Sequence, residues 1–268
     1  KPFHWFIDFY GVIKNGGFDV IIGNPPYLEN RQIDYDLLDS FVTGSPVHSV
    51  CIERSVKILK STGATSMIVP LAIVSTQRME VVQELIEEGR DTWYANYSWR
   101  PAKLFDQVNR ALTIFVAVSS QHTQTFSSGY QKWISDTRNG IMERLNFTEI
   151  PDSYDYFFVP KFSFEIDKSV FSKLSTVETT IEKFIANQNI NLIYYRTTGG
   201  LYWKVFTDFS PKFLSNGKPS TSSRETTMSF LEKSHVTAAI AILSSNLFWW
   251  WYTISSNLRD LNPTDIND

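Results

Sequence analysis

An amide, two prolines and an aromatic ring stand in a row after an apolar run. The run is Val20–Gly23, and Asn24, Pro25, Pro26 and Tyr27 follow it. An apolar strand that ends in a tight turn is typical of the edge of an α/β sheet where such folds bind ligands. The prolines restrict the backbone, so the turn would hold an amide hydrogen-bonding group and a flat ring in one geometry. A Pro-rich strand-to-helix turn without chemistry is the structural alternative.

Strand and helix patterns alternate on both sides of this turn. Apolar residues at helical spacing predict a helix over 47–60, which Gly63 would end, and a buried strand follows at 65–70. A second amphipathic helix, capped by Ser75 or Thr76, would precede Gly89, with Met79, Val82, Leu85 and Ile86 as its apolar stripe. Two more strands are expected near 92–98 and 111–119, and this last pair is able to run antiparallel. The alternation predicts an α/β fold with a largely parallel sheet.

The remaining sequence predicts a second domain. Residues 121–150 are polar and are expected to form a linker. Residues 151–268 combine short strand-like runs with a helix near 236–254 and predict a mixed α+β domain. The apolar stretch within that helix is interrupted by Ser244, Ser245 and Asn246, so we expect a buried helix and no membrane partner.

Composition limits the classes of function. The chain is 43% hydrophobic and 20% charged, as globular proteins are. Its one cysteine, Cys51, excludes an internal disulfide and suits a reducing, cytoplasmic location. No histidine or cysteine spacing predicts a metal site. The net charge is −3 and neither 1–150 nor 151–268 has an excess of Lys and Arg, so attraction to nucleic-acid phosphates would need a local patch or other protein.

Several segments together resemble the N6-adenine-specific DNA methyltransferases of single-chain restriction-modification systems (types IIG and IIS). The resemblance to the family's motifs IV, V, VI and VIII, in that order, is carried by Gly16–Asp19 with Asn24–Tyr27, by Glu53–Lys60 with Gly63, by Met67–Pro70, and by Leu104–Val108 with Thr113–Phe115. Thr198–Trp203 and Ala241–Phe248 resemble blocks of the family's target-recognition domain. The resemblance implies the later half of a Rossmann-like methyltransferase sheet at 1–120, followed by a mixed α+β target-recognition (DNA-specificity) domain at 151–268.

The resemblance also implies what the turn would do. The exocyclic amine of adenine is a poor nucleophile, because its lone pair is delocalised into the ring. The Asn24 side-chain oxygen and the Pro25 carbonyl would accept its two hydrogens and favour a nitrogen with an available lone pair, so that positioning carries the reaction. A base inside double-stranded DNA must first be flipped out. Tyr27 would stack on one face of that base, and Phe105, at the motif VIII aromatic position, on the other.

The chain departs from the family pattern at the cofactor. Such enzymes bind S-adenosylmethionine through a Gly-rich loop and an acidic residue that both precede motif IV. Only 23 residues precede Asn24 and no Gly-x-Gly occurs in the sequence. We therefore expect a carboxyl-terminal fragment that lacks the cofactor half, binds no cofactor itself and is inactive alone. The uncovered edge of the strand at 20–22 would be covered by the segment around 3–10 or by self-association.

Other assignments remain open. Arg196, Lys204 and Arg224 are candidate DNA contacts, although surface charges without a role are as common. An endonuclease domain in the whole enzyme is family analogy only. Methylation of a protein glutamine amide is an alternative, since those enzymes share Asn-Pro-Pro-Tyr, but the long segment after residue 120 argues against it. A non-catalytic DNA-recognition module is a third reading.

Overall fold

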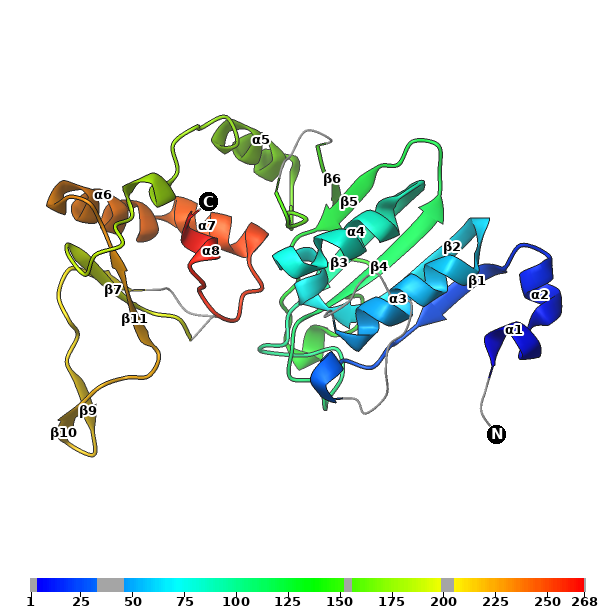
Figure 1. Cartoon of the computed structure of the whole chain (residues 1–268), viewed down its shortest axis with the longest axis horizontal. Coiled ribbons are helices and arrows are strands. Elements are labelled where there is room, and N and C mark those ends of the chain that lie inside the picture. The colour runs from blue at the N-terminus through cyan, green and yellow to red at the C-terminus, as the bar shows by residue number, and fades with distance from the viewer. Residues whose placement is uncertain (1–3, 33–45, 152–155, 199–204, 268) are drawn as a thin grey trace. The chain divides into compact units, whose positions relative to one another are not determined.

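The computed structural model describes residues 4–32, 46–151, 156–198 and 205–267 (Figure 1). Contacts within the chain define two compact units, residues 1–170 and 171–268, and each is described by itself. The sequence placed a linker at 121–150, whereas the boundary between the units falls after Val170, inside the helix α5 (Glu165–Leu174).

The first unit is built on a six-stranded mixed sheet. The strands are β1 (Phe18–Gly23), β2 (Leu59–Pro70), β3 (Arg90–Tyr97), β4 (Leu112–Ser119), β5 (Thr125–Ser128) and β6 (Phe147–Glu149), in the spatial order β1-β2-β4-β3-β5-β6. β1 pairs with β2 in parallel, and β3 with β5. β4 runs antiparallel to both β2 and β3. The predicted α/β class and the antiparallel last pair are observed. The expectation of a largely parallel sheet is wrong, because β5 and β6 also pair antiparallel and three of the five strand pairs of this sheet are antiparallel.

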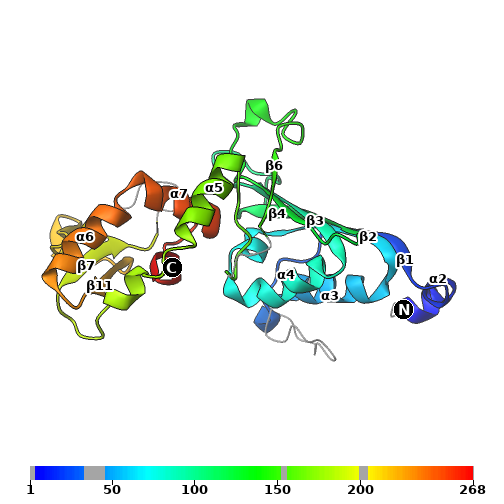
Figure 2. The same cartoon turned by 90° about the horizontal axis from the view of Figure 1, so that it is seen from above.

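Two helices cover one face of this sheet. α3 (Val47–Ile58) and α4 (Glu80–Glu87) lie on the same side of it (Figure 2). Ile52, Val69, Val82 and Phe115 are fully buried between helices and sheet, as their apolar spacing predicts. The predicted helix stop at Gly63 is wrong: α3 ends at Ile58, and Gly63 lies inside β2, where an added Cβ would sit 2.8 Å from Leu59.

The shorter helices of this unit connect the main elements. They are α1 (Trp5–Asp8), α2 (Tyr10–Lys14) and the 3₁₀ turns η1 (Asn30–Gln32), η2 (Leu71–Val74), η3 (Gln77–Met79) and η4 (Ser135–Thr137). The hydroxyls predicted to cap the helix before Gly89 instead bond backward, Ser75 to the Leu71 carbonyl at 3.0 Å and Thr76 to the Ala72 carbonyl at 2.6 Å. The chain therefore makes 3₁₀ turns before α4 begins.

Part of the predicted linker belongs to the sheet. β5 and β6 lie within 121–150, and their inward positions Ser127, Ser128 and Thr148 are buried. The buried Asn96 of β3 ties β5 to β4: its side-chain amide donates to the Ser128 carbonyl of β5 at 2.8 Å, and its oxygen accepts from Thr113 of β4 at 2.9 Å. Hydrogen bonds replace apolar contacts here, which is why a polar segment can form sheet strands.

The outer edge of β1 is open among the described residues. Val20 and Ile22 are 58% and 78% exposed, and β1 is the end strand of the sheet. The amino-terminal segment reaches only the start of the strand, where the rings of Phe9 and Phe18 lie 5.3 Å apart. The expectation that the segment around 3–10 covers this edge is therefore wrong for the described residues 4–10. Coverage by another molecule stays a prediction.

The second unit is a smaller α+β body. Its sheet has the order β11-β7-β8, from β7 (Leu192–Arg196), β8 (Phe206–Thr207) and β11 (Glu225–Ser229), and β9 (Phe213–Ser215) forms a hairpin with β10 (Lys218–Ser220). Its helices are η5 (Ile181–Phe184), α6 (Lys233–Leu243), α7 (Asn246–Ser255) and α8 (Thr264–Asn267). The single helix expected at 236–254 is two, because Ser245 caps a new helix by accepting from the Phe248 amide at 3.1 Å. No helix among the described residues is long and apolar enough to span a membrane.

Gly17 and Gly11 make a matched pair for testing the turn into β1. Gly17 has φ +112°, and a Cβ there would lie 2.4 Å from the Ile58 carbonyl oxygen, whereas a Cβ at Gly11 meets nothing within 4 Å. We expect Gly17→Ala to lower the free energy of unfolding by about 2–3 kcal/mol. Gly11→Ala should leave it unchanged or slightly higher. Urea denaturation measures both, and equal stability of the two variants would contradict the packing described for β1.

Candidate functional site

The turn after β1 presents an amide to solvent. β1 ends at Gly23, Asn24 and Pro26 are exposed, and Pro25 between them is buried. The buried proline holds the chain to the unit while the residues on either side face outward. No hydrogen bond to the Asn24 side chain is present among the described residues, so both ends of this amide are available to a ligand.

Tyr27 is anchored at its hydroxyl. The hydroxyl donates to the Ile68 carbonyl oxygen of β2 at 3.1 Å. The half-buried ring packs against an apolar cluster that includes Leu104 and Leu112. Burial raises the pKa of the Tyr27 hydroxyl to about 12, and the nearby charge of Arg110 opposes this only in part. Tyr27 is therefore a neutral phenol with a fixed ring.

Two further side chains flank this ring. His48, in the first turn of α3, meets it edge-on, with ring centroids 6.5 Å apart and planes at 89°. The guanidinium of Arg110 lies over it, 6.0 Å from the centroid. Neither residue was predicted, because both are far from Tyr27 in sequence and belong to no recognised motif.

His48 is a buried base without a hydrogen-bond partner. It is 3% exposed, and neither ring nitrogen has a partner among the described residues. Burial lowers the pKa of His48 to about 4, and the positive charge of Arg78 acts in the same direction. Arg78 is itself neutralised by Glu29, to which it donates two hydrogen bonds of 3.1 and 3.2 Å. The surroundings of Tyr27 thus hold a neutral imidazole and a satisfied ion pair.

Phe105 lies in a separate hollow of the same unit. The hollow has a volume of about 800 Å³ and is lined by residues 101–108 together with Trp133, Ser135 and Arg138. Arg138 fixes its wall by donating to the carbonyls of Lys103 and Leu104 at 3.0 and 2.7 Å. Phe105 is 37% exposed, and no ring contact joins it to Tyr27 in the described structure. The two predicted stacking residues are not brought face to face.

The candidate DNA-contacting arginines of the second unit are neighbours. Arg196 ends β7 opposite Glu225 of β11, and the Thr197 amide donates to the Arg224 carbonyl at 3.0 Å. Both arginine side chains are exposed at the same end of two paired strands. Lys204 lies outside the described residues.

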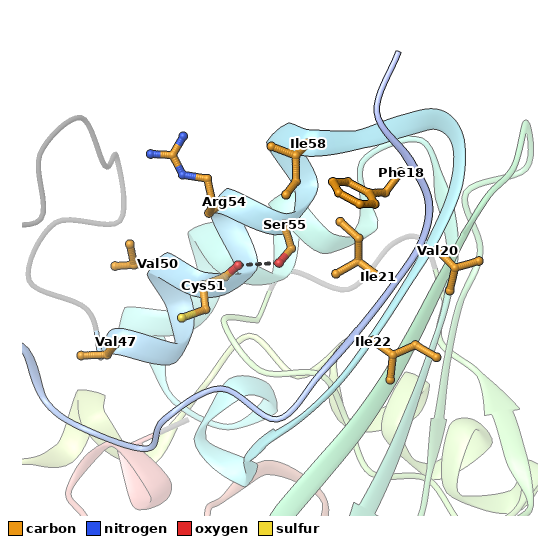
Figure 3. A pocket seen from close by; sticks show the side chains of 10 residues that line it. All are labelled: Phe18, Val20, Ile21, Ile22, Val47, Val50, Cys51, Arg54, Ser55 and Ile58. Carbon is orange, nitrogen blue, oxygen red and sulfur yellow. Dashed lines mark hydrogen bonds between the residues drawn. The ribbon is translucent and has the colours of Figure 1, made fainter. Parts of the chain in front are cut away.

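An apolar groove lies between β1 and α3. It has a volume of about 490 Å³, and Phe18 and Ile21 of the strand face Cys51, Ser55 and Ile58 of α3 across it (Figure 3). The Ser55 hydroxyl is bonded to the Cys51 carbonyl at 2.8 Å, and burial raises the pKa of the Cys51 thiol. A neutral thiol and a satisfied hydroxyl leave this groove suited to packing rather than chemistry. In the described parts of the chain no three His, Cys, Asp or Glu side chains gather to hold a metal ion.

Comparison with known proteins finds a family match for the first part of the chain. Residues 1–97 match the family of Eco57I restriction-modification methylases. A protein of Methanocaldococcus jannaschii that bears the name of a type II restriction enzyme and methyltransferase is 43% identical over an alignment of 79 residues. The match covers 26% of this chain and 6% of that protein. The resemblance to restriction-modification methylases is thereby confirmed for the segment that holds Asn24–Tyr27. Phe105 and the second unit lie outside the matched residues.

Solved structures give weaker likenesses. The DrdV–DNA complex has a TM-score of 0.41 at 14% identity and covers 50% of this chain and 17% of that one. The methyltransferase subunit of a type I restriction-modification system from Streptococcus thermophilus has a TM-score of 0.33 at 13% identity and covers 62% and 33%. With both TM-scores below 0.5, the assignment rests on the family match of residues 1–97.

His48 should make stability fall with acid. The unfolded chain takes up a proton on His48 near pH 6.5, but the folded chain does so only near pH 4. The unfolded state therefore binds more protons between these values, and stability falls as the pH drops from 6.5 to 4, by up to about 3 kcal/mol. We expect His48→Leu to remove this part of the pH dependence in urea denaturation at a series of pH values. Parallel pH profiles for the variant and the wild type would contradict the buried, unpartnered imidazole.

Proposed function

We propose that this chain is part of a site-specific DNA methyltransferase of a restriction-modification system, acting on the N6 amine of a flipped adenine. The observation that carries the proposal is the exposed, unbonded Asn24 amide beside the anchored ring of Tyr27. Both follow directly on β1, within the residues that match the Eco57I methylase family. The chain spans 6% of the curated relative's length, so the activity belongs to a longer protein.

The turn supplies two acceptors for one amine. The Asn24 side-chain oxygen accepts one hydrogen of the adenine amine and the Pro25 carbonyl accepts the other. Both bonds favour a nitrogen whose lone pair is released from the ring, and they are made most strongly as the nitrogen reacts. No strong base is required in this scheme, because the methylated amine carries a positive charge and is acidic enough to lose its extra proton to water.

The ring of Tyr27 gives the flipped adenine a stacking surface. Its hydroxyl is tied to β2, so the ring does not have to be ordered when the base arrives. Phe105 is our proposed second wall. It lies on a loop that packs beside the same apolar cluster, through Leu104, and this loop would have to approach Tyr27 on DNA binding.

The described residues do not fit the cofactor by themselves. The family's methyl donor, S-adenosylmethionine, needs a Gly-rich loop, and no Gly-x-Gly occurs in this sequence. We therefore assign to this chain the binding and orientation of the adenine, and assign the cofactor to a preceding half of a Rossmann-like methyltransferase. Residues 1–120 would complete that sheet.

The second unit is the proposed target-recognition domain. Arg196, at the end of β7, and Arg224, directly before β11, are exposed, as residues that contact double-stranded DNA would be, and Lys204 is retained as a third candidate. An endonuclease domain in the whole protein and a cytoplasmic location are parts of the same proposal.

Asn24 offers the test of this function. In the whole restriction-modification polypeptide that we propose contains this chain, Asn24→Ala should reduce the formation of N6-methyladenine by at least about a hundredfold. DNA affinity should stay within a few-fold of the wild type, because the lost bonds matter chiefly at the reacting nitrogen. Mass spectrometry of digested DNA measures the product.

Asn139→Ala is the matched control, since Asn139 is exposed in the same unit but far from the turn in sequence. It should leave methylation unchanged. Wild-type methylation by Asn24→Ala would refute the role of the amide. Methylation of a glutamine side chain in place of DNA would establish the alternative, a protein methyltransferase.

A further inference from the structure

Arg110 is held in place through its two neighbours. The backbone carbonyl of Ala111 accepts a hydrogen bond from the Leu71 amide at 3.0 Å, and the side-chain oxygen of Asn109 accepts one from the Lys103 ammonium at 2.9 Å. β4 begins two residues later, at Leu112. The side chain of Arg110 therefore leaves from a fixed point beside the turn that holds Asn24 and Tyr27.

The guanidinium of Arg110 has no hydrogen-bond or ion-pair partner among the described residues. It is exposed, and no hydrogen bond or carboxylate reaches it among the described residues; its recorded contact is the face of the Tyr27 ring at 6.0 Å. Other arginines of this unit are engaged. Arg78 pairs with Glu29, and Arg90, Arg138 and Arg144 donate to backbone carbonyls.

The charge of Arg110 also acts on the site. It lowers the pKa of both Tyr27 and His48, although burial is the larger influence on each. Its positive potential therefore reaches the surface on which a base would stack. In a chain of net charge −3, which lacks a general attraction for DNA, such a local cation is the kind of patch that phosphate binding needs.

We propose that Arg110 binds the DNA phosphate of the flipped adenine nucleotide, while Tyr27 carries its base. The proposal rests on the adenine-binding function proposed above and adds the contact that places the nucleotide. A planar guanidinium forms paired hydrogen bonds with phosphate oxygens. Without DNA, the same guanidinium rests on the ring that the base would take, and the arriving phosphate gives it a stronger partner than the ring.

The test uses the complete 268-residue chain and two fluorescein-labelled duplexes, one with a single unpaired adenine and one fully paired. Fluorescence anisotropy gives the affinity for each duplex across a NaCl titration. We expect Arg110→Gln to weaken binding of the unpaired-adenine duplex about threefold to tenfold and to lower the slope of log K against log salt by about 0.9. Arg110→Lys should restore the slope, since it restores the charge.

Lys14→Gln is the matched control. Lys14 is also an exposed cation over a tyrosine ring, 5.9 Å from the centroid of Tyr10 on α2, and its removal changes the net charge equally. It should leave affinity and slope as they are. Equal losses for Lys14→Gln and Arg110→Gln, or an unchanged slope for Arg110→Gln, would overturn the phosphate contact.

Tyr27→Ala separates this proposal from the function on which it rests. Suppose that the wild type prefers the unpaired adenine and that Tyr27→Ala abolishes this preference. The adenine site then stands. If Arg110→Gln nevertheless keeps the full salt slope, the Arg110 contact is refuted alone. If the wild type shows no preference for the unpaired adenine, the adenine site is refuted, and the Arg110 contact with it.

Discussion

The hydrogen bond from the Tyr27 hydroxyl to the Ile68 carbonyl ties the candidate site to the sheet. It joins the turn that follows β1 to the neighbouring strand β2, at a point where the parallel pairing of the two strands has ended. The ring is thereby held where His48 can meet its edge and Arg110 its face. Without this anchor the ring of Tyr27, three residues after Asn24, would be free to rotate. The Asn24 amide would then have no fixed stacking surface beside it.

Charge around the ring is balanced in a way that suits a neutral substrate with an anionic tail. Glu29 and Arg78 cancel each other, His48 is uncharged, and Tyr27 keeps its proton. Of the two arginines placed beside this ring and His48, Arg78 has a carboxylate partner and Arg110 has none among the described residues. A neutral base and a negative phosphate are the two ends of a nucleotide, and the site offers a matching environment to each.

Apolar patterning predicted much of the first unit. The runs at β2 and β4 and the stripe of Val82 and Ile86 were recognisable because their apolar side chains are buried in the core. β5 and β6 were not, because their buried positions are the polar Ser127, Ser128 and Thr148, which leave no periodic apolar signal. Ser127 and Ser128 are held by hydrogen bonds to Asn96. The exposure of Val20 and Ile22 was also missed, since an apolar pattern does not reveal whether another part of the protein covers the strand.

The residues of the candidate site likewise fall into those that the sequence predicted and those that only the fold brings together. Asn24 and Tyr27 form a contiguous motif and could be identified from sequence, whereas His48 and Arg110 reach the ring only through the folding of α3 and of the segment before β4. Phe105 was chosen by position in a motif, and the fold puts it in a hollow of its own.

The most direct measurement is a crystal structure of the complete chain bound to a duplex with one unpaired adenine. The account predicts the adenine amine within hydrogen-bonding distance of the Asn24 oxygen and the Pro25 carbonyl, with the base stacked on Tyr27. An adenine bound elsewhere, in the groove between β1 and α3 or on the second unit, would contradict it.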